Sequence, residues 1–595
     1  MEQLNPNRPK LGCLARSLIF FNIGCGLLMT LAIAWYWTAF CPVPEPGNPL
    51  FEPNEAANYV TSPLDENGDV DYFEAWHQRA SDGVTPENNV MAKLIEVLGP
   101  TDDGELVLTE YFDRLGIAPP DSDNGLISFY EWYNQQPNRI QELDEMEDGW
   151  QAADEIRAFV LNHPWTANEL PIVKQYIDEN ETSFQLVGEA LKRTEYYCPL
   201  VCEYLNNDLF LAHAPYEDGP RTIAILNAMR SNLSLGQGDI LGSSKFAVQT
   251  LELSQKISEG TLHPEWVSVA INNIGAGQLA KLIQHPKTKL KHLKSFRQQV
   301  ASLKPKKLNI EMIYFRQRLE TLNFGQLVLR QESNISQDYL DTPHVLIQMA
   351  DPETAMQHIN RLYNVAEKSI DEDLLQVSYK RCSSEEQRLL EIALDSDYHP
   401  INLRAILTGK KARGKQLGSL LTSQMLNSPD TLLDLAKRSH TNLVILKLMI
   451  EVEIYQRLNG AYPKGLQALV PKQLTTIPND PLSNTAMHYV RTDQRYQLYS
   501  LGPNGIDEGG NNPEKNSDDR DLMKREPDLS WAQHLKDLAE EEAARIAEEA
   551  LEYGTEEIES PLDLDVEDIE PEFNKPEEEE EVEEEEEEAL ETLDE

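Results

Sequence analysis

The sequence lacks the short motifs by which many enzymes are recognised. It contains no HExxH zinc-protease motif and no G-x-S-x-G nucleophile motif, and its 12 histidines are scattered. Neighbouring carboxylates carry little information, because 101 acidic residues among 595 make such neighbours common on solvated surfaces. We therefore expect a chain that is not an enzyme and that acts by binding. An extracytoplasmic hydrolase with a site assembled from isolated residues is the alternative.

Basic residues are scarce, with 52 Lys and Arg against 101 Asp and Glu. The net charge of −49 argues against a general nucleic-acid binder. About half of it comes from residues 552–595, which hold 24 acidic residues and the single Lys575. Because these charges repel one another and bury nothing, residues 554–595 are predicted to form a disordered tail. The tail either stays free or engages a basic surface, which lies on a partner or on this chain at 287–307 or 410–415.

Residues 17–40 form an uncharged run of 24 residues that ends close to three consecutive aromatic residues. This length suits a helix that crosses the roughly 30 Å hydrocarbon core of a bilayer. Arg8, Lys10 and Arg16 precede the run, and the next basic residue is Arg79. The positive-inside rule then predicts a single-pass protein of the bacterial inner membrane, with a cytoplasmic N-terminus and the bulk of the chain in the periplasm. A cleaved signal peptide is the alternative.

Cysteine is also rare, with six residues in the chain. Cys198 and Cys202 are separated by one helical turn, with Pro199 between them. In an oxidising periplasm they are candidates for a disulfide. Two buried thiols that pack as small apolar groups are the other interpretation, and the sequence leaves both open.

Residues 41–70 begin with a Pro-rich stretch, typical of a semi-rigid spacer that lifts a domain off the membrane. Within this stretch Asp65, Asn67 and Asp69 have the spacing of a calcium-binding EF-hand loop. Val70 stands where that loop needs Gly, so we expect a turn.

A second motif resembles a phosphate-binding loop. Gly409, Gly414 and Lys415 give G-x-x-x-x-G-K, but Gln416 replaces the Ser or Thr hydroxyl that would bind Mg²⁺. We interpret the segment as a basic loop.

The stretch between residues 71 and 440 is predicted to be helical. Short amphipathic segments alternate with turns up to residue 215, and PWTANELP offers a capping box between Thr166 and Glu169. From residue 216 on, the segments lengthen, and GQGD joins two of them into an αα-hairpin in which Gly236, Gly238 and Gly242 permit a tight turn. No clean 34-residue period is present, so we expect an irregular α-solenoid.

Residues 443–521 follow a different pattern. An apolar helix carries Glu453 and Arg457 as an i,i+4 pair and stops at Gly460. A short helix, GLQALV, follows it, and then a hairpin in which Tyr489 leads into the turn and Tyr496 into the return strand. The segment closes in a loop of Gly, Asn and Asp. This pattern predicts a long buried helix on a small antiparallel sheet.

The order NGAYP, GLQALV, NDP, YQLYSLGPNG and a terminal Asp cluster resembles the soluble domain of the major pseudopilin of type II secretion systems. The resemblance implies a calcium site in the loop after the last strand. Its ligands in this chain would be the Leu501 carbonyl, Asn504, and Asp518 or Asp519, with Asp507 as an added ligand. Ca²⁺ favours such oxygen ligands on a flexible loop.

The body resembles, in patches that include PWTANELPIVKQYIDEN and AMRSNLSLGQGDILGS, uncharacterised membrane-anchored proteins of planctomycete-type bacteria. That resemblance implies an architecture and no function. The predicted organisation is a cytoplasmic N-terminus (1–16), a transmembrane helix (17–40), a Pro-rich linker (41–70), an N-terminal helical domain (71–215), a helical-repeat-like domain (216–440), a pseudopilin-like domain (441–523), a charged helix (524–553) and the acidic tail (554–595).

These features together predict a mainly α protein with a small C-terminal α+β domain. We expect a binding or scaffold protein that its own N-terminal helix anchors in the membrane. Its partner is expected to be another protein. A divergent component of a type II secretion or pilus-like machine is the alternative that the C-terminal resemblance favours.

Overall fold

The computed structural model describes residues 25–27 and 29–30, most of 41–509, and residues 530, 533–538 and 544. Within 41–509 the exceptions are 102–103, 121–124, 138, 141–142, 144–148, 203–206, 258–261, 305–308, 333–346, 372–375, 378–380, 396–408, 492–494, 504 and 508. The chain divides into two units, Met1–Trp531 and Ala532–Glu595. In the second unit residues 533–538 are helical, within the predicted charged helix.

Most of the predicted membrane span and the whole acidic tail from 554 on lie outside the described residues. Among the residues that are described, no helix is both long enough and apolar enough to pass through a bilayer.

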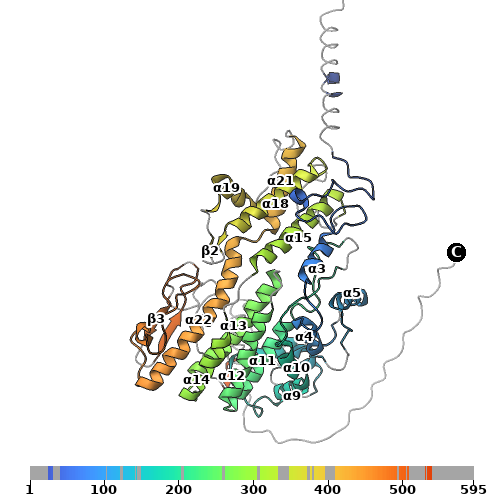
Figure 1. Cartoon of the computed structure of the whole chain (residues 1–595). Coiled ribbons are helices and arrows are strands. Elements are labelled where there is room, and N and C mark those ends of the chain that lie inside the picture. Colours follow the sequence, from blue (N-terminus) through green and yellow to red (C-terminus); the bar gives the residue numbers. More distant parts are fainter. Residues whose placement is uncertain are drawn as a thin grey trace, which may run out of the picture. The chain divides into compact units, whose positions relative to one another are not determined.

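The first unit is mainly helical, as predicted (Figure 1). Its N-terminal part is made of short helices, which are α2 (Glu55–Asn58), α3 (Tyr72–Ala80), α4 (Val90–Leu98), α5 (Glu105–Leu115), α6 (Phe129–Asn134), α8 (Gly149–Asn162), α9 (Pro171–Glu179) and α10 (Glu181–Ala190). The predicted capping box is formed, because Thr166 N–H donates to Glu169 Oε2 at 2.8 Å and Glu169 N–H donates to Thr166 Oγ1 at 3.4 Å. It closes a turn, however, since α9 begins at Pro171.

Longer helices follow, which are α11 (Gly219–Gly236), α12 (Ile240–Lys256), α13 (Leu262–Gln284), α14 (Leu290–Ser302) and α15 (Ile310–Arg330). The predicted αα-hairpin is confirmed by the packing of α11 on α12. Gly238 in its turn has a φ of +84°, a conformation that side chains other than Gly rarely adopt. A Cβ on Gly236 would lie 2.0 Å from the Trp165 carbonyl oxygen, so this position also requires Gly.

The C-terminal part contains α18 (Pro352–Lys368), β1 (Ile370–Asp371), β2 (Gln376–Val377), α19 (Ser384–Ala393), α21 (Lys410–Met425), α22 (Pro429–Asn459), the 3₁₀ helix η2 (Leu466–Leu469), β3 (His488–Arg491) and β4 (Tyr496–Tyr499). Helix α22 crosses the predicted domain boundary at 440/441 without a break. It begins after Ser428, whose hydroxyl accepts the Thr431 N–H at 3.1 Å, and ends at Gly460 with a φ of +74°, as predicted.

One hydrophobic core joins the two sides of that boundary. It contains buried residues of α12, α13 and α14 together with residues of α22, η2 and β4. Helix α13 packs on α22, and α15 packs on both α3 and α18. These contacts between helices distant in sequence go beyond the nearest-neighbour stacking expected of a solenoid.

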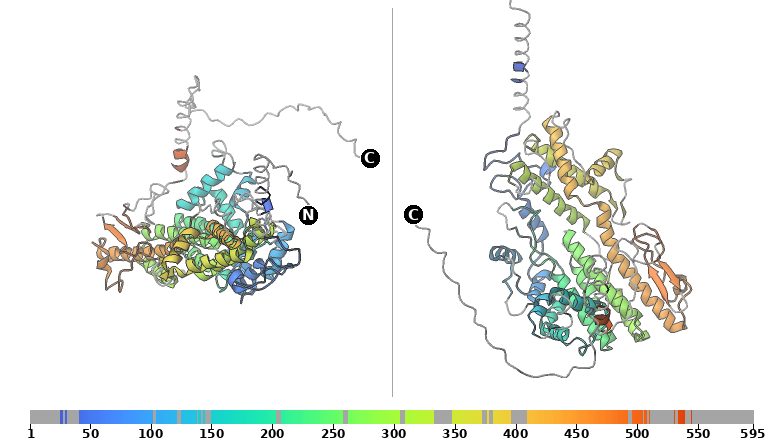
Figure 2. Two further views of the ribbon diagram at one scale, coloured as in Figure 1. Left: turned by 90° about the horizontal axis from the view of Figure 1, so that it is seen from above. Right: turned by 180° about the vertical axis from the view of Figure 1, so that it is seen from behind.

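The predicted C-terminal hairpin is confirmed. Strands β3 and β4 pair antiparallel, with His488 opposite Tyr499 and Tyr489 opposite Leu498. Leu498 is fully buried, and the hairpin lies beside the C-terminal half of α22 in every view (Figure 2). A long buried helix therefore carries a small sheet, as the sequence predicts.

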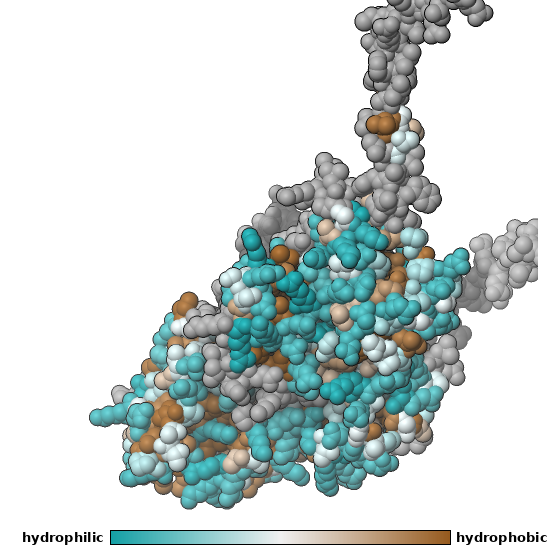
Figure 3. Space-filling model, turned by 45° about the horizontal axis from the view of Figure 1, so that its top comes forward, coloured by the Kyte–Doolittle hydropathy of each residue, from teal (hydrophilic) through white to brown (hydrophobic). Residues whose placement is uncertain are grey.

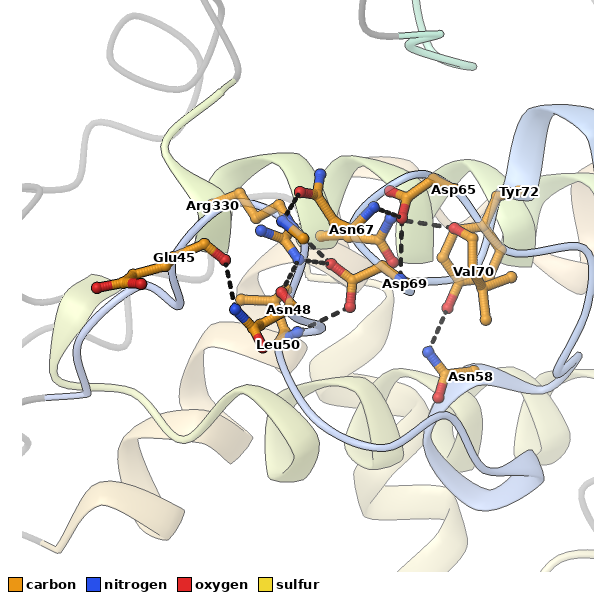
Figure 4. Close-up of polar contacts among 12 residues, drawn as sticks. Glu45, Asn48, Leu50, Asn58, Asp65, Asn67, Asp69, Val70, Tyr72 and Arg330 are labelled. Atoms are coloured by element: carbon orange, nitrogen blue, oxygen red, sulfur yellow. Dashed lines mark hydrogen bonds and ion pairs between the residues drawn. The ribbon is translucent and has the colours of Figure 1, made fainter.

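Residues 41–70 do not form the predicted spacer. The Asp69 carboxylate forms a buried ion pair with Arg330 at the end of α15, and the two side chains are 5% and 3% exposed (Figure 4). Asp69 Oδ1 also accepts the Leu50 N–H at 2.8 Å, and Arg330 donates to the Asn48 carbonyl at 2.8 Å. The prediction was wrong because the composition of this segment gives no indication of its contact with Arg330, which lies 261 residues after Asp69 in the sequence.

The predicted turn at residues 65–69 is confirmed in place of a calcium loop. The Asp65 carboxylate accepts the N–H groups of Asn67 and Asp69 at 2.8 and 2.9 Å. Gln326 of α15 donates to the Val70 carbonyl at 3.0 Å. The packing extends back to the start of the segment, where Cys41 N–H donates to the Gln348 carbonyl at 2.8 Å.

The buried ion pair gives a first prediction. Asp69→Ala should lower the free energy of unfolding by about 3–5 kcal/mol, because the Arg330 guanidinium would stay buried without its counter-charge. The matched control is Arg361→Ala, which breaks an ion pair with Glu385 whose side chains are 48% and 75% exposed. That change should cost less than about 1 kcal/mol. Chemical denaturation of the purified full chain compares the two variants, and equal losses of stability would contradict the prediction.

Candidate functional site

The predicted calcium loop follows β4. The structure describes Leu501 and Asp507, whereas Asn504, Asp518 and Asp519 lie outside the described residues. Asp507 Oδ1 accepts the Gly509 N–H at 3.0 Å and the Tyr499 hydroxyl at 2.8 Å. These two donors hold the pKa of the Asp507 carboxyl below its ordinary value. Asp507 is thus ionised at neutral pH and tied back to β4.

Among the described residues, no group of three or more His, Cys, Asp or Glu side chains is arranged to hold a metal ion. Because three of the five predicted ligands lie outside this part of the chain, the calcium site stays a prediction.

A buried carboxylate, that of Asp480, lies next to this loop and was not among the predicted site residues. Asp480 is fully buried and accepts hydrogen bonds from the Ser500 hydroxyl at 2.8 Å, the Ser483 hydroxyl at 2.6 Å and the Leu482 N–H at 3.0 Å. Ser500 directly precedes Leu501, so Asp480 fixes the point at which the loop begins. The NDP motif was the available signal, because Asp before Pro commonly organises a turn.

A second polar cluster joins α22 to the segment after it. The predicted pair is confirmed, with Arg457 Nη1 3.2 Å from Glu453 Oε2. The Tyr462 hydroxyl donates to Glu453 Oε1 at 3.1 Å, and Glu453 is 2% exposed. Burial raises the pKa of the Glu453 carboxyl, and the Arg457 charge acts in the opposite direction. The cluster fixes the chain that leaves α22, and with it the hairpin.

The segment that resembles a phosphate-binding loop is helical. Gly409 precedes α21, and Gly414 and Lys415 lie within its first two turns, so the predicted basic loop is wrong. A Cβ on Gly414 would lie 2.6 Å from the Asp351 carbonyl oxygen, and a Cβ on Gly418 would lie 2.6 Å from that of Ala355. Both glycines therefore allow α21 to pack closely on α18. This packing accounts for Gly414, the second glycine of the motif, without a nucleotide.

Cys198 and Cys202 are not joined by a disulfide. Cys198 is buried, with its sulfur 3.3 Å from the Tyr111 hydroxyl oxygen, and Cys202 Sγ lies 3.6 Å from the Asp208 carbonyl oxygen. The interpretation as two buried thiols therefore holds for Cys198 only, because Cys202 is partly exposed.

The best candidate for a binding site is a cleft of about 860 Å³ on the helical body. This volume lies within the range of roughly 300–1,000 Å³ that is usual for ligand sites. Helices α10 and α12, the segment that follows α10, and Gln299 of α14 line it. The lining residues are Gly188, Leu191, Lys192, Thr194, Glu195, Tyr196, Lys245, Val248, Gln249, Glu252, Gln255, Lys256 and Gln299.

The chemistry of this cleft is polar and of mixed charge. Its lining has three lysines and two glutamates, and none of the lining residues is Ser, Cys or His. Lys256 Nζ donates to the Arg193 carbonyl at 2.7 Å, so α12 and the segment after α10 are linked at the cleft. Burial raises the pKa of the Glu252 carboxyl, and Lys256 partly offsets this. Such an arrangement suits ion pairs and hydrogen bonds with a polar ligand.

The cleft could not be predicted from the sequence, because its mostly polar lining comes from segments that are far apart along the chain, namely α10 with the segment after it, α12, and Gln299 of α14. Comparison with known proteins adds no assignment, since no family model, no curated protein and no solved structure matches the chain.

The helical environment of Gly414 gives a second prediction. Gly414→Ala should lower stability by about 1–3 kcal/mol, because its Cβ would clash with the backbone of α18. Lys415→Ala removes an exposed side chain and should change stability by less than about 0.5 kcal/mol. Thermal unfolding with and without Mg²⁺-ATP tests both variants. A nucleotide-dependent rise in Tm that Lys415→Ala abolishes would contradict this account.

Proposed function

We propose that this chain is a membrane-anchored envelope protein that acts by binding a protein partner in the periplasm. The uncharged run at 17–40 and the charge asymmetry around it support the anchor and its direction. The cleft on the helical body supports binding, because its lining offers charged and amide groups, and two of the helices that line it, α12 and α14, share one hydrophobic core.

The polar lining of the cleft is the observation that carries this proposal. Lys192 and Lys245 are exposed, and with Lys256 they give the cleft three positive charges against Glu195 and Glu252. A partner segment that carries carboxylates and backbone amides would satisfy these groups. The molecular face in Figure 3 is mostly hydrophilic, with small apolar patches between, which fits a partner held by polar contacts.

A charge-reversal experiment tests the cleft. In the double variant Lys192→Glu with Lys245→Glu, the amount of co-purified partner should fall at least about tenfold below that of the wild type. The reason is that the charge of the site changes by four units. The control reverses Lys291 and Lys294, two exposed lysines on α14, and changes the net charge by the same amount. The measurement is co-purification from detergent-extracted membranes at low salt. Equal retention by both variants, or equal loss, would contradict a role for the cleft.

A second candidate function is a component of a secretion or pilus-like machine. The observation that favours it is the long helix α22 with the β3–β4 hairpin beside it, which agrees with the pattern expected from the pseudopilin resemblance. In this chain the long helix enters the hairpin region from a helical body, whereas a pilin helix would enter it from the membrane. The resemblance thus supports a recognition module at the end of a larger scaffold.

The same resemblance proposes calcium in the loop after β4, held by Leu501 O, Asn504 and Asp518 or Asp519. We predict that millimolar Ca²⁺ slows proteolytic cleavage between residues 502 and 519 by at least about tenfold, because ligation orders the loop. Asp518→Ala with Asp519→Ala should abolish the protection.

The control for calcium is Asp563→Ala with Asp565→Ala, which removes the same charge from the acidic tail. This variant should keep the protection. Cleavage that is insensitive to Ca²⁺ and to a chelator, or protection lost in both variants, would exclude a specific site.

A further inference from the structure

The first residue after the predicted membrane span is already part of the helical body. Cys41 N–H donates to the Gln348 carbonyl at 2.8 Å, and the nearby Asp351 N–H donates to the Lys410 carbonyl at 3.1 Å. Burial raises the pKa of the Cys41 thiol. The nearby charges of Lys410 and Arg413 lower this pKa, and that of Asp351 raises it. Residue 41 therefore lies close to the beginning of α21. Figure 1 shows α21 at one end of the helical body.

Three lysines are exposed at the start of α21. Lys410, Lys411 and Lys415 all reach solvent, and the Lys410 side chain is 51% exposed. Lys410 Nζ lies 3.9 Å from Asp351 Oδ2, which is a weak contact. Arg413 is buried and donates to the Met349 carbonyl at 2.7 Å, so it anchors the helix to the segment that also binds residue 41.

The distance along the chain places these lysines at a membrane surface. Consecutive Cα atoms are about 3.8 Å apart, so a span that ends at residue 40 leaves residue 41 in the headgroup layer. That layer is several ångströms thick on each side of the hydrocarbon core. Residues 41–70 are packed on the body and do not act as a spacer. The beginning of α21 should therefore lie close to the headgroups.

We propose that Lys410, Lys411 and Lys415 form a basic seat that rests on anionic phospholipid headgroups. The partner is the membrane in which the chain is anchored, so this inference rests on the anchor in the proposed function. Each lysine close to an anionic surface raises the equilibrium constant for the contact roughly fivefold. At physiological salt the attraction falls off over a distance of about 8 Å. The seat would fix the orientation of the body, so that the C-terminal end of α22 points away from the bilayer.

The experiment measures the reactivity of each lysine in the full chain. The protein is reconstituted into vesicles of phosphatidylcholine alone, or of phosphatidylcholine mixed with phosphatidylglycerol. A membrane-impermeant amine reagent then labels it, and mass spectrometry reads each site. We expect labelling at 410, 411 and 415 to fall at least about fivefold in the anionic vesicles and to recover at high salt. Lys291 and Lys294 on α14 serve as internal controls and should not change.

Each other outcome overturns the proposal in a recognisable way. Equal labelling of the three lysines in both kinds of vesicle, in protein that floats with the vesicles, excludes the lipid seat but leaves the anchor. Protein that does not float with either vesicle excludes the anchor and the seat together. Protection that is equal in both vesicles and disappears when residues after Gly554 are deleted would assign the lysines to the acidic tail.

Discussion

The buried ion pair between Asp69 and Arg330 determines where the chain joins its helical body. A buried carboxylate and a buried guanidinium that have lost most of their water are stable only as a pair. If the turn at residues 65–69 left α15, Arg330 would therefore remain buried without its counter-charge. Helix α15 packs on α18, and α18 packs on α21. The pair therefore holds residues 41–70 at the end of the body that these helices form. Whatever precedes residue 41 is attached at that end.

Helix α22 connects this body to the C-terminal hairpin through two nearby glutamates. Glu451 pairs with Arg297 of α14, and Glu453 binds Arg457 and the Tyr462 hydroxyl. The first contact holds α22 to the body, and the second holds the chain that follows α22. Because the hydrophobic core continues from α12 to β4, the hairpin region is part of the body. A ligand at the loop after β4 would consequently bind beside an element that shares this core with α12 and α14, two of the helices that line the cleft.

Features that depend on neighbours in sequence could be predicted, and features that depend on distant partners could not. The αα-hairpin, the Glu453–Arg457 pair, the end of α22 and the β3–β4 hairpin are all encoded within a few residues, and the structure confirms them. The spacer at 41–70 and the basic loop at 410–415 were wrong, because Arg330 and α18 supply the contacts that order them. The cleft was missed for the same reason. Of the predicted calcium ligands, Leu501 and Asp507 are described, and their role stays a prediction.

Residues 41–70 are packed as part of the helical body, so that the body follows directly on the predicted membrane span. Hydrogen exchange of the full chain tests it at the amides of Leu50, Asp65 and Asp71, which donate to Asp69 Oδ1, the Asp69 carbonyl and the Pro63 carbonyl. If opening this segment breaks the buried ion pair, these amides should exchange on the order of a thousandfold more slowly than in an unstructured peptide. Exchange within about tenfold of the unstructured rate would show a flexible spacer and contradict the account.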